Sequence, residues 1–171
     1  KPGAPTHLRE LFGPVLSVMC FDDLDEAIDL VHQTGFGLTS GIETLDEREQ
    51  QHWQRRVRAG NLYINRPTTG AIVLRQPFGG MGLSAFGPGI KAGGPSYVAQ
   101  LMDFEETGEP SGCDLTDEKL KALAIRVPSV EPALRSYTQQ ARDEFHAEHD
   151  HLRLLGQDNL RRYRPIERLC I

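Results

Sequence analysis

Hydrophobic and polar positions change in blocks along the first 65 residues, and these blocks predict alternating strands and helices. The apolar run 15–21 has the composition of a buried strand. Asp22 or Asp23 stands where a helix cap is expected. The positions that follow at helical spacing form one apolar stripe: Leu24, Ala27, Ile28 and Val31.

The same alternation is repeated once more. Residues 38–44 read as a second strand, and Asp46 can cap a helix that runs to position 58 with Trp53 and Val57 on its buried side. A third strand follows at 61–65. Crossover connections of this length predict parallel strands that are covered by helices, which is an α/β fold.

The pattern changes after the glycine-rich loops. Residues 96–104 alternate as a strand does, and the acidic, turn-rich segment 105–112 marks a boundary. We therefore predict one domain at 1–106 and a mainly helical extension at 107–171. The extension should hold a helix at 116–126, a longer one from Ser129 to Gly156, a loop at 157–165 and the start of a strand at 166–171.

Composition narrows the function classes. The net charge of −5 argues against a general binder of nucleic acid or anionic membranes, and no apolar run is long enough to span a membrane. Three widely spaced cysteines, Cys20, Cys113 and Cys170, do not predict a disulfide framework or a zinc site. We expect a cytoplasmic protein, and a chain that starts at Lys1 and stops inside a strand reads as a fragment.

Two motifs carry a resemblance to a known family. Glu10-Leu-Phe-Gly-Pro-Val15 precedes Thr69-Gly-Ala-Ile-Val-Leu-Arg-Gln-Pro-Phe78, which opens a loop with further glycines at 79, 80 and 82. Together, in this order, they resemble the C-terminal part of an aldehyde dehydrogenase, and the second motif resembles the branch that oxidises glutamate semialdehyde in proline breakdown. The resemblance spans residues 8–106. It implies a fragment of the catalytic domain with a mostly parallel sheet, an oligomerisation strand and a helical tail.

The resemblance implies that Glu10 and Phe12 bind the cofactor. The glutamate would accept hydrogen bonds from the nicotinamide ribose hydroxyls, and the aromatic ring would pack near the nicotinamide. A carboxylate offers acceptors to two vicinal hydroxyls, and a ring surface excludes water. The alternative is a surface glutamate and a core phenylalanine.

The resemblance also implies a substrate site at Gly70, Ala71 and Phe78. The amides of Gly70 and Ala71 would donate to the α-carboxylate of the substrate, since small residues let an anion approach the main chain. Phe78 would form part of an aromatic wall around the aliphatic part. The alternatives are a plain loop at 70–71 and a structural ring at Phe78.

We expect no catalytic residue in this chain. Cys20 reads as buried filler, and none of the three cysteines has the context of the family's nucleophile, so the chain alone should be inactive. Surface histidines explain His146, His149 and His151 better than a metal site does. The run 161–164 should make local salt bridges.

The expected activity is therefore the NAD-dependent oxidation of L-glutamate γ-semialdehyde, which forms from 1-pyrroline-5-carboxylate by ring opening, to L-glutamate. The last fifteen residues resemble, weakly, a tail of bifunctional proline-utilising enzymes, which would add FAD in a separate proline dehydrogenase domain. The strand at 96–104 would pair with a second subunit in a homo-oligomer, or else lie within one chain. Two alternatives remain open: a dehydrogenase for another aldehyde, and a non-catalytic module for subunit assembly.

Overall fold

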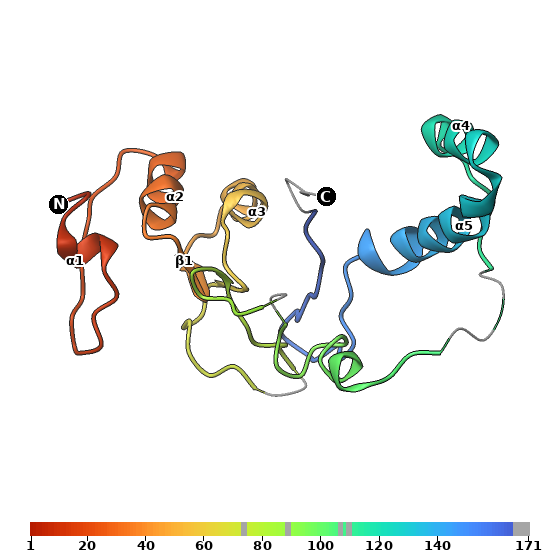
Figure 1. Ribbon diagram of the computed structural model, residues 1–171. Helices are drawn as coiled ribbons and strands as arrows, with labels where there is room; N and C mark the ends of the chain where they lie inside the picture. The colour runs from red at the N-terminus through yellow and green to blue at the C-terminus, as the bar shows by residue number, and fades with distance from the viewer. Residues whose placement is uncertain (73–74, 88–89, 106–107, 109–110, 166–171) are drawn as a thin grey trace. The chain divides into compact units, whose positions relative to one another are not determined.

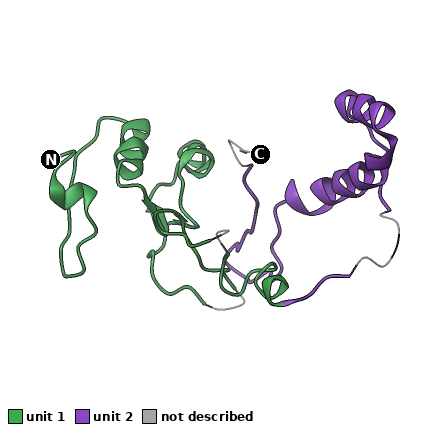
Figure 2. Cartoon of the chain, viewed as in Figure 1, with its two compact units in different colours: residues 1–101 green, residues 102–171 purple. Residues whose placement is uncertain are grey.

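The computed structural model describes residues 1–72, 75–87, 90–105, 108 and 111–165 (Figure 1). The chain divides into two compact units, residues 1–101 and 102–171 (Figure 2). Among the described residues, all the strands lie in the first unit. The division into 1–106 and 107–171 stays a prediction, because residues 106–107 lie outside the described part of the chain.

The two helices predicted in the first unit are confirmed. α2 (Leu24–His32) begins after Asp23, whose carboxylate accepts a hydrogen bond from a backbone amide of the first turn at 2.8 Å. α3 (Glu47–Arg56) begins after Asp46 in the same way, also at 2.8 Å. Both aspartates therefore satisfy amides that have no partner inside the helix.

The predicted parallel pairing is confirmed for one pair of strands. β2 (Thr39–Ile42) and β3 (Asn61–Ile64) run in parallel, with Thr39 opposite Asn61. α3 forms the crossover between them, as expected for parallel neighbours.

A second, antiparallel pair was not expected from the sequence. β1 (Phe36–Gly37) pairs with β4 (Met81–Gly82), which lies in the glycine-rich region. The prediction of a mostly parallel sheet thus holds for β2 and β3 but not for this pair. Two-residue strands leave too short a pattern to read from sequence.

The core lies between the two helices and the parallel strands. Ile28, Trp53 and Val57 are buried there. They pack against partly buried side chains from α2, β2 and β3: Leu24, Ile42, Leu62 and Ile64. Because side chains alternate along a strand, Asn61 and Tyr63 are buried away from this cluster, toward the loops that follow β3.

Two predicted strands are wrong. Residues 15–21 are extended but unpaired, and Leu16 and Val18 are 85% and 79% exposed. Residues 96–104 contain a 3-10 turn, η1 (Val98–Leu101), in place of a strand. A strand needs a neighbour to satisfy its backbone, and the described part of the chain provides none beside either segment.

The second unit is helical, with a different end from the one predicted. α4 (Glu118–Arg126) is followed by the short η2 (Pro128–Val130) and by α5 (Glu131–Gln140), which continues into a π turn, η3 (Ala141–Phe145). The helix stops there and does not run on to Gly156.

A backbone pairing occupies the chain beyond this stop. His149 and Arg161 exchange two backbone hydrogen bonds of 2.9 and 2.8 Å, which turns the chain back on itself. Ser129 is not the cap of α5, whereas Pro132 does lie in its first turn, as predicted. The strand predicted at 166–171 lies outside the described residues.

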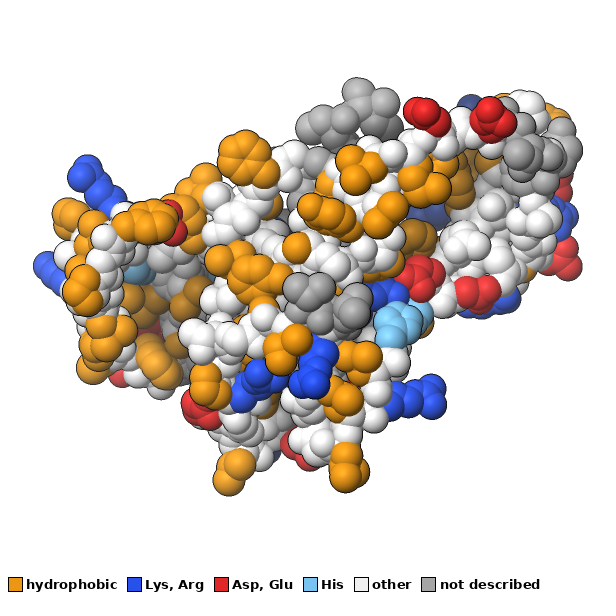
Figure 3. Space-filling model, turned by 90° about the horizontal axis from the view of Figure 1, so that it is seen from below, with side chains coloured by type: hydrophobic (Ala, Val, Ile, Leu, Met, Phe, Trp, Pro, Cys, Tyr) orange, Lys and Arg blue, Asp and Glu red, His pale blue; other side chains and the backbone are white. Residues whose placement is uncertain are grey.

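Large hydrophobic side chains are exposed in both units, and many are visible on the face in Figure 3. Phe12 and Phe86 are almost fully exposed in the first unit, and Phe104 and Leu155 in the second are 78% exposed or more. Only large contiguous patches of such side chains are a recognised mark of interaction surfaces.

Candidate functional site

The loop 65–78 leaves β3 from a fixed starting point. Asn65 has a positive φ of 54°. Its side chain accepts a hydrogen bond from the Thr44 amide at 2.9 Å and donates one to the Thr44 carbonyl at 3.0 Å. The Asn65 side chain therefore substitutes for a backbone partner. It ties this end of the loop to Thr44, two residues after the end of β2.

Gly70 and Ala71 lie in the middle of this loop. Gly70 is exposed and has a φ of +83°, and no atom lies within 4 Å of the place where a Cβ would be. Ala71 is half-buried. Among the described residues, neither amide has a hydrogen-bond acceptor. Adjacent amides without an acceptor in the described part of the chain are donors of the kind that bind anions, and the role of Gly70 and Ala71 stays a prediction.

The other end of the loop is held by two side chains. Asn61 donates to the carbonyl of Pro77 at 3.1 Å and accepts from the amide of Gly79 at 3.2 Å. The ammonium of Lys91 donates to the carbonyl oxygens of Gly60 at 2.5 Å and Gly79 at 2.7 Å. Burial lowers the pKa of Lys91 to about 8.

Phe78 is half-buried, and its backbone is paired. Its amide donates to the Ala92 carbonyl at 3.0 Å, and the Ala92 amide donates back at 2.8 Å. The pairing gives the Phe78 backbone a structural role and leaves the role of its ring as predicted: a wall around a ligand or a packing ring.

Glu10 and Phe12 follow α1 (Pro5–Leu8), a single turn that the sequence did not predict. His7 fixes this turn: its Nδ1 accepts from the Gly3 amide at 3.0 Å and its Nε2 donates to the Leu30 carbonyl of α2 at 2.8 Å. Because Nδ1 accepts, the proton of the neutral ring is on Nε2.

Both predicted cofactor-binding residues are exposed. Phe12 is 97% exposed, so the alternative of a core phenylalanine is wrong. Among the described residues, the Glu10 carboxylate has no hydrogen-bond or ion-pair partner, and no such contact links residues 10–12 to Gly70 or Ala71. The roles of Glu10 and Phe12 in cofactor binding stay predictions.

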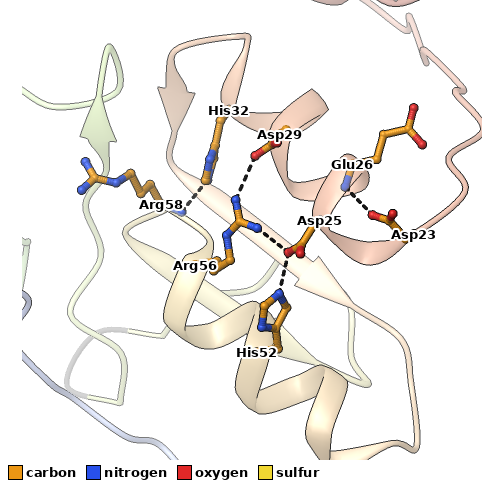
Figure 4. A network of polar contacts seen from close by, with 8 residues as sticks. All are labelled: Asp23, Asp25, Glu26, Asp29, His32, His52, Arg56 and Arg58. Atoms are coloured by element: carbon orange, nitrogen blue, oxygen red, sulfur yellow. Dashed lines mark hydrogen bonds and ion pairs between the residues drawn. The ribbon is translucent and has the colours of Figure 1, made fainter.

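The polar network between α2 and α3 is structural (Figure 4). The Asp25 carboxylate accepts hydrogen bonds from His52 Nε2 at 2.5 Å and from Arg56, which also reaches Asp29 at 3.1 Å. The hydrogen bond from His52, followed by that from Arg56, lowers the pKa of Asp25 against the opposing effect of desolvation. These residues join the two helices at the surface.

The second unit holds its own charged cluster around Glu144. The carboxylate accepts from the Tyr163 hydroxyl at 3.0 Å and pairs with Arg161 at 2.8 Å and His149 at 3.2 Å. The bond from Arg161 is the main reason why the pKa of Glu144 is lowered. The salt bridges predicted for the run 161–164 are confirmed at Arg161, and Arg162 adds a second one.

The histidines and cysteines can be placed individually. His146 and His151 are exposed, and the ring of His149 stacks on that of His151 with the centroids 5.5 Å apart. Cys20 is exposed and outside any strand, so the prediction of buried filler is wrong, since the strand that would have buried it is not formed. Cys113 is half-buried. Over the described ranges, no group of His, Cys, Asp and Glu residues could hold a metal ion.

Sequence reasoning missed Lys91 as a functional candidate. A lysine inside a run of glycines and apolar residues was the available signal, because a charge there must find partners. The described residues include no helix that is both long and apolar enough to cross a membrane.

Comparison with known proteins adds to this picture. Residues 1–106 match the aldehyde dehydrogenase family. The bifunctional protein PutA of Rhizobium meliloti is 53% identical over 96 residues, which cover 55% of this chain and 8% of that protein. The chain therefore spans a small part of the length of its relatives.

Two solved structures are similar. Proline utilization A (PutA) from Corynebacterium freiburgense has a TM-score of 0.91 and 44% identity, covering 98% of this chain and 17% of the other. The 1-pyrroline-5-carboxylate dehydrogenase from Thermus with bound NAD has a TM-score of 0.53 and 40% identity, covering 58% and 19%. With more than half of its residues matched, this chain belongs to the aldehyde dehydrogenase family.

Proposed function

We propose that the enzyme carrying this chain oxidises L-glutamate γ-semialdehyde to L-glutamate with NAD. The observation that carries the proposal is the pair of amides at Gly70 and Ala71, which have no acceptor among the described residues. A carboxylate is the part of this substrate that an uncharged aldehyde lacks, and it needs convergent donors of this kind. Relatives named PutA and 1-pyrroline-5-carboxylate dehydrogenase support the assignment.

The chain contributes binding groups to the reaction. Gly70 and Ala71 hold the α-carboxylate, and Phe78 lies seven residues beyond Ala71 on the same loop, where its ring can bound the aliphatic part of the substrate. Glu10 and Phe12 form one edge of the cofactor site. NAD accepts a hydride from the substrate carbon when it is bound.

The catalytic thiol and the general base belong to other parts of the enzyme in this proposal. Cys20 lies on an exposed extended segment, and Cys113 lies in the second unit, outside any helix or strand. A cysteine nucleophile requires a neighbouring base, and among the described residues no histidine or carboxylate is hydrogen-bonded to either thiol. The chain alone is therefore inactive.

Replacing Ala71 in the whole enzyme tests the carboxylate site. Ala71→Leu places a branched side chain beside the amides and should weaken binding of the carboxylate by about 1.5–3 kcal/mol, the contribution of hydrogen bonds to a charged group. That loss corresponds to a KM for glutamate semialdehyde raised about tenfold or more. The KM for NAD and the activity toward an uncharged short aldehyde should not change.

The matched control is Ala122→Leu, on the exposed surface of α4. It should leave all kinetic constants unchanged. An unchanged KM for glutamate semialdehyde in Ala71→Leu would show that the carboxylate does not bind at these amides, and the dehydrogenase for another aldehyde would then be the better assignment.

A role in subunit assembly has its own support. Around η1, Val98 and Leu101 are 61% and 82% exposed, and Phe104 is 78% exposed. We propose that this segment packs against a second subunit. Sedimentation of the 171-residue chain over a range of concentrations should show dimers or larger species, and a monomer at high concentration would contradict this proposal.

A further inference from the structure

The two ends of the loop 65–78 are anchored by different means. At the first end, Asn65 makes two hydrogen bonds to the backbone of Thr44. At the second end, the contacts that hold the backbone at Pro77 and Gly79 come from elsewhere in the unit: the side chains of Asn61 and Lys91 and the pairing of Phe78 with Ala92.

Lys91 is the residue that ties these contacts together. Its ammonium lies between the carbonyl oxygens of Gly60, just before β3, and Gly79, just after the loop, at 2.5 and 2.7 Å. The Asn61 carboxamide oxygen lies 3.5 Å away and accepts from the Gly79 amide as well. One cation therefore bridges the strand on which the loop starts and the segment on which it ends.

The charged ammonium of Lys91 makes its hydrogen bonds within this bridge. Among the described residues, no carboxylate pairs with its ammonium, and its pKa of about 8 reflects burial without a compensating anion. A lysine buried for packing alone would cost free energy that an apolar side chain would not. Three oxygen acceptors around the ammonium satisfy its three donors in the manner of a fixed structural cation.

We infer that Lys91 is a positioning residue for substrate: together with Asn61 it fixes the end of the loop 65–78 and thereby the place and direction of the Gly70 and Ala71 amides. The inference rests on the proposed function, in which those amides bind the α-carboxylate. Positioning matters because amides must converge on the anion to within hydrogen-bond distance, and a loop held at one end only would not keep them there.

The test uses the whole enzyme with Lys91→Met, which keeps the length and apolar stem and removes the donors. The KM for glutamate semialdehyde should rise about tenfold, a change of 1.4 kcal/mol in binding, while the KM for NAD stays the same. The turnover of an uncharged short aldehyde, which has no carboxylate to place, should also stay the same. Lys119→Met, on the exposed surface of α4, is the matched control and should change nothing.

A second variant protects the test against a folding defect at position 91. Asn61→Asp keeps the shape and the acceptor for Lys91 but removes the donor to the Pro77 carbonyl, and it should give the same selective rise in KM. Equal losses on both aldehydes, no loss on either, or unfolding of both variants would overturn the inference. A wild-type enzyme with no preference for glutamate semialdehyde over the uncharged aldehyde would instead contradict the proposed function, whatever the variants do.

Discussion

Gly60 and Gly79 pass so close that a Cβ on Gly60 would lie 1.6 Å from the carbonyl oxygen of Gly79. That carbonyl is the same one that accepts from Lys91. No side chain can occupy position 60 unless the backbone of the glycine-rich segment moves away from the start of β3. The close approach therefore couples the fold of the first unit to the position of the loop.

Gly60→Ala should destabilise the first unit by about 1–3 kcal/mol or more, the cost of forcing extra atoms into a packed site. The loss of stability can be measured by urea unfolding of the chain, with the fluorescence of Trp53 as the signal. This single tryptophan is 4% exposed in the core of that unit. Gly13→Ala is the control: nothing lies within 4 Å of its added Cβ. Equal urea midpoints for Gly60→Ala and Gly13→Ala would show that the glycine-rich segment can move away from position 60 without a loss of stability.

The core between α2, α3 and the parallel strands gives a second prediction. Ile28 is 2% exposed, whereas Val31 on the same helix is 44% exposed. Ile28→Ala should cost about 2–5 kcal/mol, because it removes buried methylene groups and leaves a cavity. Val31→Ala should cost about 0.5 kcal/mol or less, as is usual at the surface. Measuring the free energy of unfolding of both variants tests this prediction. Similar losses of stability in the two variants would mean that α2 packs through a different face.

The contrast between Ile28 and Val31 also shows what a sequence pattern can and cannot predict. The apolar stripe of α2 was predicted from Leu24, Ala27, Ile28 and Val31, and the structure confirms Ile28 as its centre while Val31 faces solvent. The cap at Asp46 and a strand at 61–65 followed from local chemistry, so the sequence could predict them. The sequence left the first cap open between Asp22 and Asp23, and the structure shows Asp23.

Segments 15–21 and 96–104 were mispredicted for a different reason. Their alternation or apolar content is suited to a strand, but a strand also needs a partner, and none is paired with either segment in the described residues. The predicted binding residues Gly70 and Ala71 could be located from a motif. Lys91 could not be tied to them, because its role depends on a contact with Gly60, which lies 31 positions away in the sequence.

Acid pH should weaken the link between α2 and α3. The folded-state pKa of Asp25 lies below its ordinary value of 3.8, so ionised Asp25 contributes stability above that value, and the contribution is lost as the pH falls through the lowered pKa. Asp25→Asn should therefore lower the melting temperature at neutral pH and make no difference in strong acid. The effect should shrink in high salt, because these groups are exposed to solvent.

Asp158→Asn is the control for this change, because Asp158 is exposed in the second unit and forms no hydrogen bond or ion pair with another described residue. It should leave the unfolding of the first unit unchanged at every pH. A melting-temperature difference for Asp25→Asn that persisted unchanged into strong acid would show that the charge of Asp25 is not what joins the helices.

The titration of Lys91 gives a further prediction, at alkaline pH. Its folded-state pKa of about 8 lies below the ordinary 10.5, so between these values the unfolded chain binds more protons than the folded one. Stability should therefore rise with pH across this window, by at most about 1.4 kcal/mol per pH unit for one group. Lys91→Met lacks this titration, and the difference in unfolding free energy between wild type and variant should shift in favour of the wild type from pH 8 to 10.5. Parallel pH profiles for the two chains would mean that the ammonium is not held in a desolvated place, and the bridge between Gly60 and Gly79 would then lose its physical basis.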